Sequence, residues 1–268
     1  MNLQRFINAK QDELRALRQH MPEPLDESAA FPGGKRPDFL SALTAPLADG
    51  APLHIIAEYK RASPSAGTIN DERSPQQAAR QYAAGGASCM SVLTEQQYFR
   101  GNTADLSAAA AAAPGLPLLR KDFIFDERQV RQSFATPASA LLLIVALTPS
   151  VSQLRDLREL AESRGLHAVV EIFSEAELDI ARTSGARIIQ VNARNLETFA
   201  TDRRAGLSLA GRRLPGECWI AASAMSRPEH LQDASAAGYQ AALIGTALMK
   251  APDPERELRQ LLHPGIAT

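Results

Sequence analysis

Residues 55–65 read Ile-Ile-Ala-Glu-Tyr-Lys-Arg-Ala-Ser-Pro-Ser, an apolar run that closes on a carboxylate and an ammonium two residues apart. Side chains alternate between the two faces of a β-strand, so Glu58 and Lys60 point the same way. Burying charge is costly unless the charges are paired. The stretch therefore predicts either a structural ion pair at the end of a core strand or an acid and a base in an active site.

The same pattern recurs along the chain, because several later apolar runs of strand length also end on residues that carry chemistry. Lys121 follows one run, Glu171 closes another, and Asn192 and Arg194 share a face at the end of a third. These runs lack a helical period, which favours strands over helices. Together with the first, they make eight expected strands, the later ones at residues 88–94, 116–123, 140–146, 167–171, 187–194, 218–223 and 240–245.

Helical patterns separate several of these runs. They have polar starts, apolar spacing near 3.6 and in most cases a glycine close behind the end, and they lie at residues 74–84, 149–164, 174–184 and 227–237. The alanine tract at 108–113 suits another helix, since alanine is the best helix former. Strands that alternate with helices are parallel, because each helix returns the chain to the start of the next strand.

Eight such units in 268 residues predict a single (β/α)8 barrel, the TIM barrel, for which about 250 residues is typical. A doubly wound open sheet is the alternative, but no Gly-x-Gly-x-x-Gly turn follows the first strand. We expect one domain over residues 1–268, with the barrel at 51–268 and an extension at 1–50. Within the extension, Asn2 to His20 predicts one amphipathic helix and Met21 to Gly50 a loop. The expected apolar stripe consists of Leu3, Phe6, Ile7, Leu14 and Leu17.

The composition sets limits on partners and location. With 29 basic and 30 acidic residues the chain has no overall field to attract nucleic acid or an anionic membrane. The first twenty residues lack an apolar signal core and no run is long enough to span a membrane, so we expect a cytoplasmic protein. Cys89 and Cys218 lie in apolar strands and are expected to be core residues. Five scattered histidines predict no metal site, and we expect no cofactor.

At this point the motifs become recognisable, because the chain resembles indole-3-glycerol phosphate synthases over nearly its full length. These are (β/α)8-barrel enzymes of tryptophan biosynthesis. Any one motif would be weak, but their shared order is specific. The matching segments lie at residues 55–65, 91–95, 98–101, 119–124, 141–146, 170–171, 192–196, 198–199 and 244–249.

The resemblance implies a reaction that closes the pyrrole ring of 1-(2-carboxyphenylamino)-1-deoxyribulose 5-phosphate, with loss of carbon dioxide and water. The aromatic carbon that bears the carboxylate attacks the ketone of the sugar chain. By resemblance, Lys121 is the general acid at the ketone oxygen. Lys60 anchors the carboxylate and is a candidate to protonate the departing hydroxyl. Glu171 and Glu58 are both candidate bases for the dehydration, and the sequence does not choose between them.

The resemblance also implies the groups that hold the substrate. Asn192 and Arg194 would bind its carboxylate and sugar hydroxyls. The expected phosphate ligands are Ser63, Ser223, Gly245 and Thr246. The expected apolar walls around the anthranilate ring are Phe99, Phe123 and Leu196, for which ordinary core packing is an equally good interpretation. The expected partner is thus a small phosphosugar–anthranilate molecule, bound by a monomer or a weak homodimer.

One loop departs from the family pattern. Where the family ends its seventh strand with Glu-Ser-Gly-Ile, this chain has Ala222-Ser223-Ala224-Met225. The missing glutamate belongs to the catalytic set, and an alanine in place of the glycine disfavours a positive φ near the phosphate. Ala193 and Ser139 are further differences. Three interpretations stay open: an ordinary synthase, a diverged paralogue that closes a related ring on a modified anthranilate-derived substrate, and a non-catalytic barrel that binds a phosphosugar or a protein.

Overall fold

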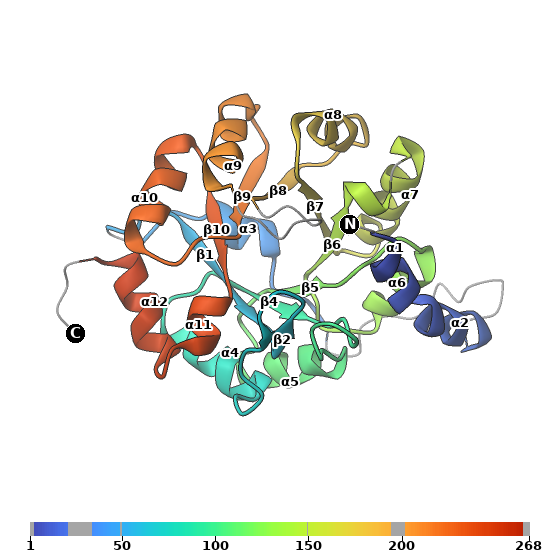
Figure 1. Ribbon diagram of the computed structural model, residues 1–268, viewed down its shortest axis with the longest axis horizontal. Coiled ribbons are helices and arrows are strands. Elements are labelled where there is room, and N and C mark those ends of the chain that lie inside the picture. Colours follow the sequence, from blue (N-terminus) through green and yellow to red (C-terminus); the bar gives the residue numbers. More distant parts are fainter. Residues whose placement is uncertain (1–2, 21–33, 49, 149, 194–201, 265–268) are drawn as a thin grey trace.

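The computed structural model describes residues 3–20, 34–48, 50–148, 150–193 and 202–264. Eight parallel strands close into a barrel in the order β1-β10-β9-β8-β7-β6-β5-β4, and helices surround it (Figure 1). The barrel strands are β1 (His54–Tyr59), β4 (Cys89–Leu93), β5 (Leu118–Lys121), β6 (Ala140–Ile144), β7 (His167–Ile172), β8 (Ile188–Asn192), β9 (Cys218–Ala222) and β10 (Ala241–Ile244). A short antiparallel pair, β2 (Ala62–Ser63) and β3 (Gly67–Thr68), follows β1.

The helices after β1 are mostly the crossovers between successive barrel strands, and they confirm the predicted alternation. They are α4 (Pro75–Ala84), α5 (Ala104–Ala112), α6 (Glu127–Phe134), α7 (Val151–Glu162), α8 (Glu175–Thr183), α9 (Arg203–Leu209), α10 (Pro228–Ala237), α11 (Thr246–Lys250) and α12 (Pro254–Leu262), with 3₁₀ turns η1 (Val145–Leu147) and η2 (Ala210–Arg212). Helix α4 shows why they begin where the sequence predicts. The Ser74 hydroxyl accepts a hydrogen bond from the Gln77 backbone amide, and the Gln77 side chain accepts one from the Ser74 backbone amide. Pro75 occupies the first turn of the helix.

The predicted extension is partly wrong. Two helices, α1 (Gln4–Ala9) and α2 (Gln11–His20), replace the single expected helix, and a third, α3 (Phe39–Thr44), lies within the expected loop. The third helix was missed because its capping signal, Asp38 accepting from the Ser41 backbone, opens only a six-residue helix. Its apolar side chains, Phe39 and Leu43, are buried all the same.

The two parts of the extension serve opposite ends of the barrel. Helix α3 contacts β4 and β9. The His54 ring lies 3.1 Å from the Ala45 carbonyl, and Asp38 lies 3.3 Å from His167, so α3 closes the end where the strands begin. Helices α1 and α2 instead lie beside the end of β5 and the helix α6 (Figure 1).

The cysteines are core residues, as predicted. Cys89 and Cys218 are free thiols, fully or nearly fully buried. Burial raises the pKa of the Cys218 thiol to about 12, and that of Cys89 is also well above its usual value. Thiols in this state are poor nucleophiles.

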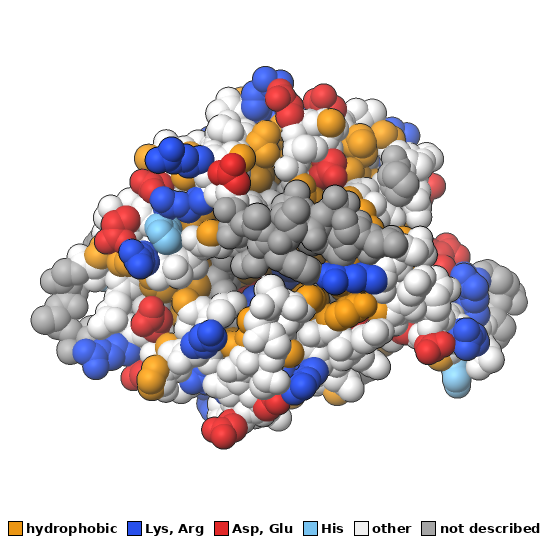
Figure 2. Space-filling model, viewed as in Figure 1, with side chains coloured by type: hydrophobic (Ala, Val, Ile, Leu, Met, Phe, Trp, Pro, Cys, Tyr) orange, Lys and Arg blue, Asp and Glu red, His pale blue; other side chains and the backbone are white. Residues whose placement is uncertain are grey.

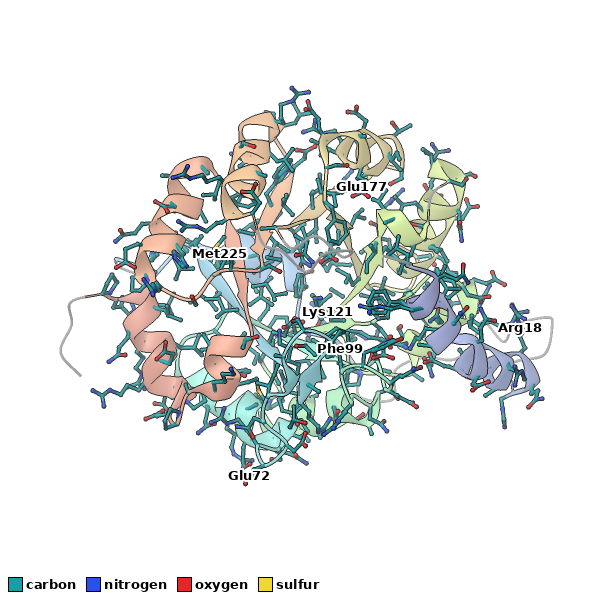
Figure 3. The ribbon with its side chains drawn as sticks, in the orientation of Figure 1. Arg18, Glu72, Phe99, Lys121, Glu177 and Met225 are labelled. Atoms are coloured by element: carbon teal, nitrogen blue, oxygen red, sulfur yellow. The ribbon has the colours of Figure 1, made fainter. Side chains whose placement is uncertain are left out.

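The outer surface carries charges of both signs. On the face shown in Figure 2, basic and acidic side chains are interspersed over the described residues. None of the helices in the described ranges is long and apolar enough to cross a membrane. Figure 3 places Lys121 and Phe99 near the middle of the barrel, and Arg18 and Glu72 at its periphery.

Candidate active site at the barrel mouth

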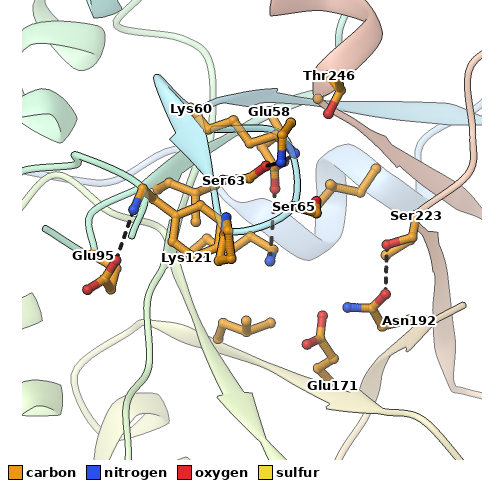
Figure 4. A pocket seen from close by; sticks show the side chains of 18 of the residues that line it. Glu58, Lys60, Ser63, Ser65, Glu95, Lys121, Glu171, Asn192, Ser223 and Thr246 are labelled. Carbon is orange, nitrogen blue, oxygen red and sulfur yellow. Dashed lines mark hydrogen bonds and ion pairs between the residues drawn. The ribbon is translucent and has the colours of Figure 1, made fainter. Parts of the chain in front are cut away.

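A cavity of about 470 Å³ opens where the barrel strands end. In (β/α)8 barrels this is the end that carries the active site. Most of the residues singled out from the sequence line it: Glu58, Lys60, Ser63, Phe99, Lys121, Phe123, Glu171, Asn192, Ser223, Gly245 and Thr246 (Figure 4). The remaining two, Arg194 and Leu196, lie outside the described residues.

One buried carboxylate stands between two lysines. The Lys60 ammonium lies 2.5 Å from Glu58 Oε1, and the Lys121 ammonium lies 3.9 Å from Glu58 Oε2. Both lysine side chains are mostly buried, so solvent screens these charges weakly. The cluster can therefore anchor an anion and deliver a proton at the same place.

The strand register explains why these side chains meet. Four inward residues from alternate strands form each layer of such a barrel. Following the pairing around the sheet places Glu58 of β1, Lys121 of β5, Glu171 of β7 and Ala222 of β9 in one layer. Ala222 is buried and lines the cavity, so it occupies the fourth position of the layer with a methyl group.

The candidate phosphate ligands come from the loops after the first and the last two strands. Ser223 donates its hydroxyl to Asn192 Oδ1 at 2.7 Å, so these two side chains hold each other (Figure 4). A Cβ on Gly245 would clash with Glu58 Oε1 and stand 3.0 Å from the Lys60 ammonium. Any larger residue there would displace the ion pair, so the position that lines the cavity beside Glu58 requires glycine.

The turn after β9 keeps a left-handed backbone without glycine. Ser223 has φ 70° and Ala224 has φ 57°. A Cβ in this region crowds the backbone, so the two residues store conformational strain beside the cavity. The sequence pattern disfavoured a positive φ at Ala224, and the structure shows that the loop adopts one nevertheless.

Relieving this strain should stabilise the protein. We expect Ala224→Gly to raise the free energy of unfolding by about 0.5–1 kcal/mol, because glycine adopts φ near 57° without the Cβ clash. Ala236→Gly is the matched control: Ala236 is exposed within α10, and glycine there should lower stability by about 1 kcal/mol. Urea unfolding measures both. Equal losses in the two variants would show that residue 224 is unstrained.

Aromatic rings form one wall of the cavity. Phe123 stacks on Phe6 of α1 with centroids 4.2 Å apart and lies 6.2 Å from Phe99. Glu95 supports this wall, since its carboxylate accepts from the backbone amides of the loop that carries Phe99. Phe6 and Glu95 were not assigned to the site from sequence, although both line the cavity.

A buried ion pair ties the extension to the strand that carries Lys121. The Lys10 ammonium, 1% exposed, lies 2.7 Å from Asp122 Oδ1. Burial alone would raise the pKa of Asp122, but the charges of Lys10 and Arg120 hold it below its usual value. Lys10 lies four residues after the buried Phe6 and so falls on the same face of the helix. This spacing is the sequence signal that could have predicted the burial of Lys10.

The site offers no obvious metal centre. Among the described residues, no group of three or more histidine, cysteine, aspartate or glutamate side chains is placed to hold a metal ion. What the described lining provides is carboxylates, ammonium groups, hydroxyls and an apolar wall, a set suited to proton transfer on an anionic, partly aromatic molecule.

Known proteins share both the sequence and the fold. A chain from Desulfosudis oleivorans named indole-3-glycerol phosphate synthase is 40% identical over 261 residues, covering 97% of this chain and 98% of its own length. One of the same name from Aromatoleum aromaticum is 37% identical over 97% of this chain and 98% of its own. Among solved structures, a 3-hexulose-6-phosphate synthase superposes with a TM-score of 0.62 at 14% identity, covering 78% of this chain and 100% of its own, which shows the fold alone.

The family model for indole-3-glycerol phosphate synthase matches residues 3–261, from the first described helix to the last. Together with the relatives' near-complete coverage, this match means that the chain belongs to the indole-3-glycerol phosphate synthase family.

Proposed function

We propose that this protein is a carboxy-lyase that closes the indole ring of 1-(2-carboxyphenylamino)-1-deoxyribulose 5-phosphate, releasing carbon dioxide and water. The observation that carries the proposal is the buried Glu58 between Lys60 and Lys121 at the base of a cavity with an aromatic wall. An anionic, aromatic substrate needs a cation, an acid and a flat apolar surface together. The family membership gives the reaction its name.

In the proposed reaction, Lys121 protonates the ketone oxygen while the aromatic carbon attacks the carbonyl carbon. Lys60 anchors the carboxylate that leaves as carbon dioxide, with Arg194 and Asn192 on the carboxylate and the sugar hydroxyls. The dehydration then removes a proton from the substrate and expels the hydroxyl, which Lys60 protonates as it leaves as water. Other lining groups hold the substrate: Ser63, Ser223, Gly245 and Thr246 at the phosphate, and Phe99, Phe123 and Leu196 at the ring.

The structure favours Glu171 over Glu58 as the proposed base. Two ammonium groups lie within 4.0 Å of Glu58 and favour its charged form, which opposes protonation. In the part of the chain that the structure describes, no lysine or arginine forms an ion pair with Glu171. Glu171 also lines the cavity, where a substrate proton can reach it.

Incubating the purified protein with the carboxyphenylamino-deoxyribulose phosphate tests the proposal. We expect the fluorescence of an indole product to rise with time. Binding without any product would favour the non-catalytic barrel. The absence of both binding and product would show that this molecule is not the substrate.

We further propose that the protein acts in the cytoplasm, as a monomer or weak homodimer.

The methyl group of Ala222 favours a second candidate, ring closure on a modified anthranilate-derived substrate, because it leaves room in the catalytic layer. Restoring a carboxylate distinguishes the two. If the protein is an ordinary synthase with a drifted loop, Ala222→Glu combined with Ala224→Gly should raise kcat/KM on the unmodified substrate about tenfold or more. Unchanged or lower kcat/KM would mean that the loop is fitted to another substrate. Ala224→Gly alone is the control for relief of strain.

A further inference from the structure

Gln190 is a polar side chain in the interior of the barrel, below the cavity. It lies on β8, is 0% exposed, and does not line the cavity. The strand pairing sets it directly beside Glu171 of β7, and its side-chain amide donates to Glu171 Oε2. The same pairing places it in the layer below Glu58, Lys121 and Glu171. Leu142, Leu243 and Ser91 share that lower layer, and the Ser91 hydroxyl makes no hydrogen bond to the amide.

The other end of this amide is unsatisfied. Gln190 Oε1 is buried, and no hydrogen-bond donor from the described residues reaches it. An unpaired buried acceptor is destabilising, and a leucine would avoid it. Among the described residues, the side chain that donates a hydrogen bond to the Glu171 carboxylate is the Gln190 amide. The glutamine is thus explained by its contact with Glu171 better than by packing.

We propose that Gln190 is the positioning residue for Glu171 and that it serves the carboxyl group in both protonation states. The Nε2 group donates to the carboxylate. When Glu171 takes a proton from the substrate, a half-turn of the amide presents Oε1, which then accepts from the new carboxylic acid. The proton later passes to water and the amide turns back. This inference rests on the proposed function, in which Glu171 is the base.

An amide suits this task better than a charged or apolar side chain. A lysine would oppose protonation of Glu171, and a second carboxylate would repel its charged form. Methionine has nearly the same shape and offers neither a strong donor nor a strong acceptor. Gln190→Met therefore removes the hydrogen bonds and keeps the packing.

Steady-state kinetics over a range of pH tests the role. In Gln190→Met we expect kcat to fall about 10- to 100-fold, from the loss of one hydrogen bond to a charged group, while KM changes less than about threefold. The acidic limb of the pH–kcat profile should move to higher pH, because the bond that Gln190 donates to the charged carboxylate is stronger than the bond it would accept from the neutral acid. Gln240→Met is the control: Gln240 bonds the Trp219 backbone where the strands begin, so its loss should lower stability and leave the profile unchanged.

An unchanged kcat and pH profile in a folded Gln190→Met protein would overturn the inference. A second measurement needs no substrate: the melting temperatures of Gln190→Met, Glu171→Met and the double variant. Non-additive losses support the pairing, and strictly additive losses overturn it. A wild-type protein without turnover would instead refute the proposed function, and the melting temperatures would then still decide the contact.

Discussion

Lys121→Met lowers kcat by ~10²–10⁴-fold if Lys121 is the general acid, since this is the usual contribution of a positioned proton donor. Methionine fills nearly the same volume without a proton to give, so the aromatic wall and the phosphate end of the cavity should persist. KM should change little. Stopped-flow or steady-state fluorescence of the indole product measures both constants.

Two comparisons make this result specific. Lys60→Met should raise KM as well as lower kcat, because a carboxylate anchor acts on the bound substrate before reaction. Lys35→Met should match the wild type, since Lys35 is exposed and does not line the cavity. Near wild-type turnover by Lys121→Met would remove this residue from the mechanism.

Lys10→Met is expected to lower the free energy of unfolding at pH 7 by about 3 kcal/mol, the lower end of the range for breaking a buried ion pair. Lys10 and Asp122 are both almost fully buried. Removing the Lys10 ammonium leaves the Asp122 carboxylate buried without this partner. Arg120 still lies 3.3 Å from Asp122, which limits the loss. Urea unfolding measures the difference. Activity should also fall, because Asp122 directly follows Lys121 in the chain.

The effect should depend on pH in a defined direction. The folded-state pKa of Asp122 lies below its unfolded value, so its stabilisation is complete above about pH 4 and is lost as the pH falls through the folded pKa. The gap between wild type and Lys10→Met should therefore narrow in acid. Arg15→Met is the matched control, since Arg15 is 71% exposed in its pair with Asp12 and should contribute little. Equal losses in both variants would contradict the buried pair.

The barrel could be predicted because its strands and helices carry strong local signals. Apolar runs without a helical period gave all eight barrel strands, and caps such as Ser74 fixed where helices begin. The extension was harder, because α3 is short and its burial depends on the distant strands β4 and β9. A single amphipathic stripe over Asn2 to His20 also concealed the break near Lys10 and the burial of that charge.

The candidate site shows the same contrast between local sequence signals and long-range contacts. Residues at strand ends, such as Lys121 and Glu171, could be found because the carboxyl ends of parallel strands meet at one mouth. The residues that contact them could not be predicted from the sequence. Gln190 is one polar residue within an apolar run, and only the register with β7 shows that it contacts Glu171. Phe6 lines the cavity and stacks on Phe123, a contact between distant parts of the chain that no local pattern predicts.

The most direct test of the central claim is a carbon balance on the purified wild-type protein. The carboxyphenylamino-deoxyribulose phosphate, labelled with ¹³C in its carboxylate, is incubated with enzyme, and labelled carbon dioxide and indole product are counted together. We expect equal amounts of the two, formed at rates that fall in parallel in Lys121→Met. Labelled carbon dioxide without indole product, or bound substrate that releases neither, would contradict the assignment of ring closure to this barrel mouth.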